Sequence, residues 1–385
     1  MEPTANRTPL PNTSRARRSA EEKLYSASQW QLMRWRFTRH RLAVVSLFVV
    51  IGLYFVAAFC EFLAPYDPND FHPDYQLAPP QPIRFVDSAG RFTLRPFVYG
   101  RNAILNMETL GYTYEDDTNA RYPICFFLRT GKPYKLWGQF SANLRFFGVK
   151  DPDATIFLLG TDRLGRDVFS RLIYGARPSM TIGLVGVGLS LVLGVFLGGL
   201  SGFFGGWVDL LIQRVIEMLS ALPTIPLWMG LAAAVPLDWD PIRVYFMITI
   251  LLSLIGWTGL ARVVRGRFLS LREEDFVKAA RLANSSELRI IFRHMLPSFL
   301  SHIIASVTLA IPGMILAETS LSFLGLGLKP PVVSWGVLLQ EAQNLRTVAL
   351  APWNLAPAIP VVVAILTLNF MGDGLRDATD PYGKA

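Results

Sequence analysis

The chain has 385 residues, of which 51% are hydrophobic and 17% are charged, and its formal net charge is +8. A soluble domain has about a quarter of its residues charged. The apolar residues here gather in long runs, so the composition indicates a polytopic membrane protein. The basic residues lie beside these runs, where membrane topology accounts for them, and no nucleic-acid partner is expected. The two cysteines, Cys60 and Cys125, have no metal-binding spacing and are too few for a disulfide framework.

Six segments are apolar over the length that a bilayer-spanning helix needs, about 20 residues. The first, residues 42–60, contains no charge. The third contains Pro223 and Pro226, which a helix bundle tolerates where neighbours satisfy the freed carbonyls. The predicted fold is therefore an all-α polytopic membrane protein with six transmembrane helices. The other five spans are expected within residues 179–208, 218–237, 244–261, 295–317 and 348–372.

The distribution of Lys and Arg predicts the orientation, because cytoplasmic flanks carry an excess of positive charge. Nine such residues lie from Arg7 to Arg41, before the first span, and eight lie from Arg262 to Arg293, between the fourth and fifth spans. The short connection at 236–243 carries almost none. With six spans, both termini and the second basic segment are expected in the cytoplasm. The first span begins about 40 residues into the chain, is too long for the apolar region of a signal peptide and lacks a clear small-x-small cleavage site, so we expect no cleavage there.

Composition divides the chain into several parts. Residues 29–40 combine Trp and Arg, which is typical either of an interfacial helix or of a plain positive flank with Trp anchors. After the first span, alternating aromatic stretches predict a small mostly-β periplasmic insert with a turn at Gly131, Lys132 and Pro133. This insert either docks another protein or caps the ends of the spans. The predicted divisions are 1–41 (N-terminal tail), 42–63 (first transmembrane helix), 64–158 (insert), 159–372 (core with five transmembrane helices), 262–297 (cytoplasmic loop within the core) and 373–385 (cytoplasmic C-terminal tail).

Residues 157–179 (FLLGTDRLGRDVFSRLIYGARPS) predict an interfacial helix that leads into the second span, with Thr161 or Asp162 as its cap. Arg166 and Arg171 would lie on a different face from its apolar residues. Within the second span, three glycines recur every four residues, and small residues at this spacing allow another helix to approach closely. We expect helix packing at these positions, which are Gly194, Gly198 and Gly202.

The segment between the fourth and fifth spans is charged and amphipathic, unlike its apolar neighbours. Ser270 and Glu273 have the spacing of a capping box and predict the start of a helix. A turn at residues 284–287 leads to a second amphipathic stretch that Pro297 ends, so the pattern predicts a helix–turn–helix hairpin. A few polar residues are enough to join two spans, whereas a rigid hairpin with a face of small alanines is suited to docking a soluble partner.

This hairpin resembles the EAA coupling loop of binding-protein-dependent ABC importer permeases. Three further blocks are similar to the second, C-type permease of dipeptide, oligopeptide and nickel importers: 159–179, ETSLSFLGLGLKPPVVSWG at 318–336, and GDGLRDATDP at 372–381. The long insert and residues 157–166 resemble the branch linked to microcin C-like peptides. The resemblance implies a type I importer permease core preceded by one additional helix. In the hairpin, the matching residues are Ala279, Ala280, Leu296 and Pro297, while His294 replaces an isoleucine.

Two hairpin residues depart from the family pattern. Lys278 replaces a glutamate, which either points to a compensating acid on the partner or marks a position of little energetic weight. Asn284 replaces a glycine, and asparagine tolerates a left-handed turn better than other residues with a side chain. The resemblance implies that the loop couples this chain to an ATPase through Asp275, Phe276, Lys278, Ala279, Ala280, Arg281, Asn284, Leu296 and Pro297.

The sequence contains no GxxxxGK[ST] motif, so we expect no enzymatic activity and no cofactor in this chain, with ATP and Mg bound by partner subunits. The four histidines have no metal-ligand spacing, and no catalytic residues are predicted. Two places in the fifth span could line a translocation path. His302 is either a path residue or a neutral imidazole bonded to a backbone carbonyl. Glu318, with Thr319 and Ser320, either faces the path or caps the turn that follows.

The resemblance implies a subunit of a bacterial inner-membrane ABC importer that moves a peptide or peptide-like substrate by alternating access. The implied partners are a sister permease in a heterodimer, two ABC ATPases, a periplasmic substrate-binding protein and membrane lipid. A sugar, an opine or nickel is an alternative substrate for the same machinery. A membrane scaffold or receptor without transport activity, or an exporter, is a different class and would leave the four sequence blocks together unexplained.

Overall fold

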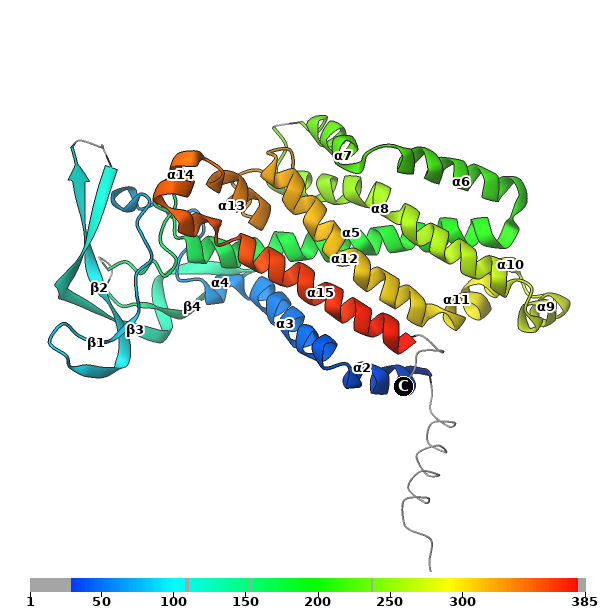
Figure 1. Ribbon diagram of the computed structural model, residues 1–385, viewed down its shortest axis with the longest axis horizontal. Coiled ribbons are helices and arrows are strands. Elements are labelled where there is room, and N and C mark those ends of the chain that lie inside the picture. Colours follow the sequence, from blue (N-terminus) through cyan, green and yellow to red (C-terminus); the bar gives the residue numbers. More distant parts are fainter. Residues whose placement is uncertain (1–28, 108–110, 152–153, 237, 380–385) are drawn as a thin grey trace, which may run out of the picture.

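The computed structural model describes residues 29–107, 111–151, 154–236 and 238–379. The parts of the two predicted tails before residue 29 and after residue 379 lie outside the described residues. The helices form an elongated bundle, with a β-sheet at one end and the short helix α9 (Asp275–Leu282) at the other (Figure 1).

Among the described residues, five helices are long and apolar enough to cross a membrane, and one bent pair of helices is a sixth candidate. The prediction of a polytopic helical membrane protein with a small β region is therefore confirmed. The five spans consist of α3 (Arg41–Ala58), α5 (Val168–Phe204), α8 (Pro241–Leu271), α12 (Leu300–Phe323) and α15 (Ala358–Thr379), the last preceded by the short helix η3 (Pro352–Leu355).

The third predicted span, expected within residues 218–237, is present as a bent pair of helices. The chain forms α6 (Gly206–Ala221) and α7 (Thr224–Ala233), which are bent by 89° at a short break. Leu222 and Pro223 both have extended backbone at this break. The residue before a proline is pushed away from helical dihedral angles, and Pro223 has no N–H with which to continue the helix.

The region before the second span also differs from the prediction. The expected interfacial helix and the span are one helix, α5, which has 37 residues and contains Pro178. Its cap is Asp167, whose Oδ2 accepts hydrogen bonds from the backbone N–H and the hydroxyl of Ser170 at 2.8 and 2.6 Å. Neither Thr161 nor Asp162 takes this role, because Asp162 stabilises an earlier turn by accepting the N–H groups of Leu164 and Arg166.

The glycine-rich face of α5 lies against α8. A Cβ atom at Gly198 would lie 2.5 Å from the carbonyl oxygen of Ala261, and one at Gly202 would lie 2.6 Å from Cβ of Phe268. At Gly194 the nearest atom, Cβ of Leu260, would be 3.0 Å away. The two backbones therefore approach more closely than a larger side chain permits, as the glycine spacing led us to expect.

The insert contains a four-stranded antiparallel sheet, and the mostly-β prediction is confirmed. The predicted turn at Gly131 is wrong, because that stretch lies inside a strand at a register irregularity. The chain reverses instead at Trp137 and Gly138, whose φ angles are 52° and 74°, and Gln139 N donates to Leu136 O at 3.1 Å. The strands follow the order β1 (Arg84–Val86), β2 (Phe92–Asn106), β3 (Gly111–Leu136) and β4 (Phe140–Val149).

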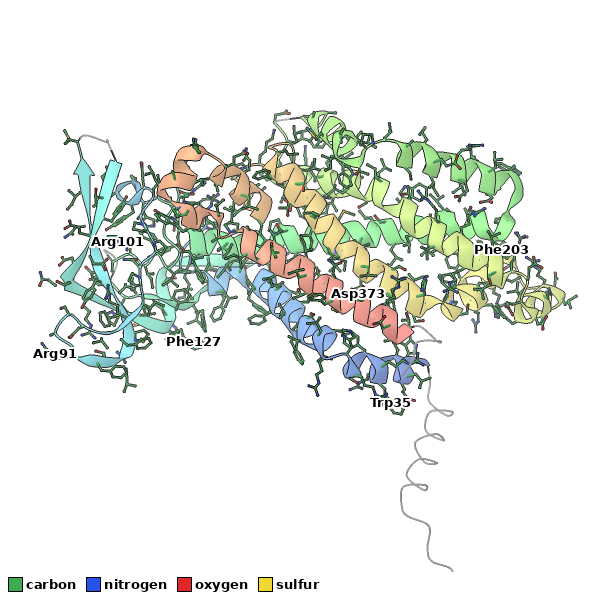
Figure 2. The ribbon with its side chains drawn as sticks, in the orientation of Figure 1. Trp35, Arg91, Arg101, Phe127, Phe203 and Asp373 are labelled. Atoms are coloured by element: carbon green, nitrogen blue, oxygen red, sulfur yellow. The ribbon has the colours of Figure 1, made fainter. Side chains whose placement is uncertain are left out.

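Short helices complete the fold. Helix α2 (Gln29–Arg39) precedes the first span and exposes about half of Trp30 and Trp35, which favours the interfacial helix over a plain flank (Figure 2). The remaining elements are α4 (Cys60–Leu63), η1 (Pro73–Tyr75), α13 (Trp335–Ala342), α14 (Leu345–Leu350) and, after α9, α10 (Glu287–Arg289), the π-helical turn η2 (Ile290–Met295) and α11 (Leu296–Ser298).

Candidate docking hairpin and polar network

The α9–α11 hairpin (residues 275–298) is attached firmly to the ends of two spans. Its buried side chains form one apolar cluster with Phe203 of α5 and with Val264 and Phe268 of α8. Arg281 adds a cation–π contact, with its guanidinium carbon 5.2 Å from the centre of the Phe203 ring. A force on this hairpin would therefore act directly on α5 and α8. The buried hairpin residues are Val277, Ile290, Ile291 and Met295.

The start and the end of the hairpin differ from the predictions. Ser270 does not begin a new helix, because α8 continues to Leu271, and α9 then begins with Glu274 at its cap position. Pro297 does not end the second half either. It lies in the first turn of α11, where proline is tolerated because its missing N–H has no partner within the helix.

The turn at Asn284 holds the hairpin in shape. Asn284 has a φ of 55°, which is a left-handed backbone conformation. This agrees with the prediction that asparagine can replace the glycine of the family pattern at this turn. Three backbone bonds close the end of α9: Ala283 N to Ala279 O at 2.9 Å, Asn284 N to Arg281 O at 2.9 Å and Ser285 N to Ala280 O at 3.1 Å. These bonds satisfy carbonyls at the helix end that would otherwise have no partner.

The outer face of the hairpin is exposed and partly apolar. Most of the predicted coupling residues lie on α9 and its turn, where Asp275, Lys278 and Ala279 are exposed and Ala280 is half-buried. The structure adds one residue that the sequence pattern did not single out, because Leu282 is 89% exposed at the tip. An exposed face of this kind marks an interaction site. Its large apolar members are Phe276, Leu282 and Leu288, whereas the exposed Phe292 lines a groove with residues of α5 and α12.

The other predicted coupling residues have different surroundings. Leu296 is half-buried and packs against the apolar cluster, while Pro297 is exposed at the base of the hairpin. Lys278 forms no ion pair with any of the residues that the structure describes. Its charge is therefore available to an acid on another protein.

Glu318 is fully buried where α5, α12 and α13 meet. Its Oε1 accepts hydrogen bonds from the hydroxyls of Ser322 at 2.8 Å and Ser334 at 2.9 Å, and its Oε2 accepts one from Ser179 at 3.3 Å. Ser322 Oγ in turn accepts from Leu328 N at 3.0 Å, within the turn that follows α12. These contacts join three helices and stabilise that turn.

The other candidate path residues divide into two places. Thr319 is buried beside Glu318 and its hydroxyl donates to Glu318 Oε2 at 3.5 Å, and the half-buried Ser320 follows on the same helix. His302 is half-buried near the start of α12. The 16 residues between His302 and Glu318 correspond to about 24 Å along a helix, so the two side chains belong to opposite ends of the span.

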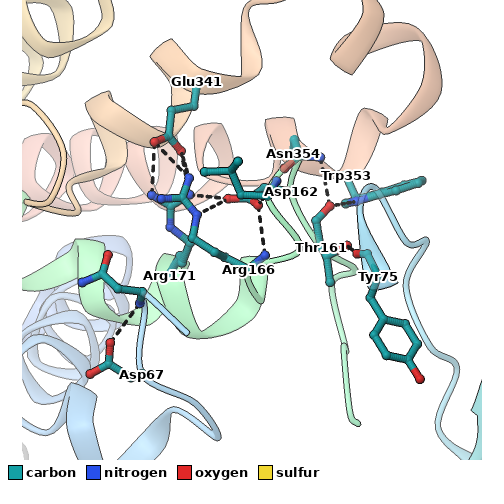
Figure 3. A network of polar contacts seen from close by, with 11 residues as sticks. Asp67, Tyr75, Thr161, Asp162, Arg166, Arg171, Glu341, Trp353 and Asn354 are labelled. Carbon is teal, nitrogen blue, oxygen red and sulfur yellow. Dashed lines mark hydrogen bonds and ion pairs between the residues drawn. The ribbon is translucent and has the colours of Figure 1, made fainter. Parts of the chain in front are cut away.

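A buried ionic network lies at the sheet end of the bundle (Figure 3). Asp162 Oδ2 binds Arg166 Nε at 2.7 Å and Arg171 Nη1 at 2.6 Å. Glu341 of α13 binds the same two arginines at 3.0 and 2.6 Å. Two carboxylates thus balance two guanidinium groups, as burial of charge requires. This polar network joins the loop before α5 to α13.

Neighbouring residues tie the same loop to two more segments. Thr161 O accepts hydrogen bonds from Trp353 Nε1 at 2.9 Å and Asn354 Nδ2 at 3.4 Å (Figure 3). The hydroxyl of Thr161 donates to Tyr75 O and accepts from Ala78 N. The LGTDR stretch is therefore a junction between the insert, α5 and the segment before α15. The sequence gives no signal for the pairing with Glu341, which lies 170 residues beyond Arg171.

Asp167 lies next to this network and is fully buried. Burial raises the pKa of Asp167 to about 7, and the hydrogen bonds from Ser170 offset only part of that effect. Its Oδ1 atom has no hydrogen-bond partner among the described residues. The cap of the longest span is therefore a carboxyl group that titrates near neutral pH.

Comparison with known proteins identifies the family of this chain. The profile described as binding-protein-dependent transport system inner membrane component matches residues 190–382, and that of the N-terminal TM domain of oligopeptide transport permease C matches residues 28–80. A peptide permease protein of Brucella suis is 34% identical over 265 residues, which are 68% of this chain and 84% of that protein. The oligopeptide transport system permease protein OppC of Haemophilus influenzae is 40% identical over 226 residues, 58% of this chain and 70% of that protein.

Solved structures of an ABC transporter are also similar. A chain of the MetNI methionine ABC transporter, in an inward-facing conformation, matches 55% of this chain and 98% of its own length, with 15% identity and a TM-score of 0.44.

The principal family match includes the α9–α11 hairpin together with all of α8, α12 and α15. Components of this kind are multi-pass inner-membrane subunits of ABC transporters. They have no catalytic site or cofactor of their own and act with ATPases and a binding protein. This chain therefore belongs to the inner-membrane components of binding-protein-dependent transport systems, in the group of oligopeptide and dipeptide C-type permeases.

Proposed function

We propose that this permease forms, with a similar sister permease, the path by which peptides or peptide-like molecules enter the cell. Peptide substrates are supported by the relatives, which include dipeptide and oligopeptide permeases. The observation that carries the transport mechanism is the exposed α9–α11 hairpin, whose buried side is fixed to α5 and α8. This arrangement is what coupling to a soluble motor requires.

In this mechanism the hairpin is the contact with one ATPase subunit. Phe276 and Leu282 enter a recess of that subunit, and Lys278 meets an acid there. When ATP brings the two ATPases together, the hairpin moves with its ATPase and carries the ends of α5 and α8 along. Such a rigid-body movement exchanges inward- and outward-facing states.

The orientation follows from the same proposal. The hairpin and both termini lie in the cytoplasm, and the insert lies in the periplasm, where it meets the substrate-binding protein or covers the ends of the spans. The basic flank from Arg262 to Arg293 supports this orientation, because positive residues favour the cytoplasmic side. Within the family we assign the chain to the microcin C-like branch, on the grounds of the folded insert and residues 157–166.

Glu318, Thr319, Ser320 and His302 remain proposed path residues. In the described conformation Glu318 is enclosed by three helices, so a path role requires α5 and α13 to move away from it during the cycle. Exposure of Glu318 in only one state would let its carboxylate bind the amino group of a peptide.

The proposed function is tested by co-purification and uptake. The full-length permease is expected to co-purify with a sister permease and two ATPases. In vesicles containing this assembly, uptake of a labelled oligopeptide is expected to require ATP and the binding protein. A microcin C-like peptide compared with a dipeptide tests the assigned branch. Purification without any ATPase, from cells that produce all subunits, would contradict the proposal.

A further inference from the structure

The first span has a face that the other described residues leave uncovered. Only 22% of the α3 window is buried, compared with 28% to 44% for the other four spans. Val45, Phe48 and Phe55 lie along this face and are 59%, 68% and 51% exposed. Because α3 has the length and composition of a transmembrane helix, this apolar face is available to lipid.

The uncovered face continues into the insert without a break. Ring centroids are 4.9 Å apart for Phe55 and Phe59, 6.0 Å for Phe59 and Trp137, and 6.3 Å for Trp137 and Phe140. Trp137 and Phe140 are 51% and 60% exposed. Phe127, which Figure 2 shows at the edge of the insert near the helices, is 61% exposed and lies 6.2 Å from Phe62. A row of aromatic rings thus leads from the span to the tip of the β3–β4 hairpin.

The depth of this tip is fixed by hydrogen bonds to the end of α3. Trp137 Nε1 donates to Ala58 O at 2.6 Å, and Trp137 N donates to Glu61 Oε1 at 3.1 Å. Arg177 of α5 binds both oxygens of Glu61 at 2.5 and 2.6 Å and donates to Ala57 O and Ala58 O at 2.9 Å. The indole is therefore held at the level where α3 leaves the hydrocarbon region, which is where Trp is enriched in membrane proteins.

We propose that the β3–β4 hairpin is a membrane anchor, inserted in the headgroup region of the phospholipid leaflet next to the insert. Trp137, Phe140 and Phe127 provide its apolar contacts, and the exposed cations Arg129 and Lys135 on β3 meet lipid phosphates. Trp137 occupies a left-handed turn position where Asn or Gly is usual. A reversal of the chain alone does not call for an exposed indole there, whereas an indole at this level is typical of a membrane interface.

The insert offers its own control surface. Phe92 is 68% exposed and stacks on Phe85, at a ring distance of 6.5 Å, in the β1–β2 part of the sheet. Figure 2 shows the neighbouring Arg91 at the end of the insert remote from the helices. Phe92 is thus as exposed as Phe140 and equally aromatic, but it lies away from the spans.

The test uses environment-sensitive labels in the full-length chain. Cys60 is buried, so Cys125→Ala followed by Phe140→Cys or Phe92→Cys leaves one accessible thiol for a nitrobenzoxadiazole label. The labelled proteins are reconstituted, with their partner subunits, in vesicles of phosphatidylethanolamine and phosphatidylglycerol. Part of the lipid carries a nitroxide at acyl position five. We expect blue-shifted emission and about twofold stronger quenching at position 140 than at position 92.

Two results with the labelled proteins would overturn the anchor. Equal, water-like emission at both positions would show that the hairpin stands clear of the bilayer. Blue-shifted emission at position 140 without quenching by the lipid nitroxide would show that a protein covers it instead. A second variant, Trp137→Phe, checks the result without a label, because its loss should remove a component of the tryptophan emission that brominated lipid quenches. An unchanged quenched fraction in Trp137→Phe would also contradict the proposal.

Discussion

A methyl group added at Gly198 tests how closely α5 and α8 approach each other. The new Cβ would lie 2.5 Å from the carbonyl oxygen and 2.9 Å from the Cα atom of Ala261. Both are backbone atoms, so no side-chain rotation relieves the contact and the helices must separate. Gly188 lies on the same helix, and a Cβ there meets nothing within 4 Å. Gly188→Ala is therefore the matched control for Gly198→Ala.

The expected magnitude follows from two opposing effects. Replacing a glycine inside a helix by alanine stabilises the helix by roughly 0.5–1 kcal/mol. Inserting a methyl group into a packed contact costs about 1–3 kcal/mol. The first effect is shared by the two sites and cancels in their difference. Gly198→Ala should therefore be less stable than Gly188→Ala by about 1–3 kcal/mol, and Gly188→Ala should equal or exceed the unmodified chain.

The free energy of unfolding can be measured on the purified full-length chain in mixed micelles, by titration with sodium dodecyl sulfate and far-ultraviolet circular dichroism. Parallel titrations of the two variants and the unmodified chain give the difference directly. A Gly198→Ala chain as stable as Gly188→Ala would refute the close approach of α5 and α8. That result would also remove the basis for expecting α5 and α8 to move together when the hairpin moves.

Three further predictions use other residues. Glu341→Ala should lower the free energy of unfolding by about 3–5 kcal/mol, because Arg166 and Arg171 are then left with Asp162 as their one carboxylate partner in this network. A loss near zero in the same titration would contradict this. Lys278→Glu should change the free energy of unfolding by less than about 0.5 kcal/mol. It should nevertheless lower the degree to which the binding protein stimulates ATP hydrolysis by the assembled transporter. Full stimulation would exclude a compensating acid on the ATPase. For Asp167, whose pKa is raised to about 7, the folded state holds a proton that the unfolded state releases at lower pH. The unmodified chain should therefore lose stability relative to Asp167→Asn as the pH rises from 5 to 8, and a pH-independent difference would count against the assigned pKa.

The sequence predicts those features of this fold that depend on local composition. Apolar runs predicted the five continuous spans because a helix in lipid must be apolar over about 20 residues. The left-handed conformation of Asn284 was predictable because few residues tolerate a positive φ. The break at Pro223 was missed because hydropathy carries no information on backbone angles. The predicted cap at Asp162 was wrong because its carboxylate is used by a different turn.

Long-range features were not predictable from these patterns. The pairing of Arg171 with Glu341 depends on how α5 and α13 pack, and the exposure of Leu282 depends on how the hairpin sits on α8. The enclosed position of Glu318 likewise results from three serines on different segments, each of which is unremarkable in the sequence.

The central claim is that the α9–α11 hairpin binds an ATPase subunit, and two exposed leucines test it most directly. Leu282 is 89% exposed at the hairpin tip, and Leu345 is 84% exposed on α14 near the opposite end of the bundle (Figure 1). The measurement is the amount of ATPase that co-purifies with full-length permease carrying Leu282→Glu or Leu345→Glu. We expect Leu282→Glu to lose most of the ATPase and Leu345→Glu to retain it. Equal recovery from the two variants would contradict the account.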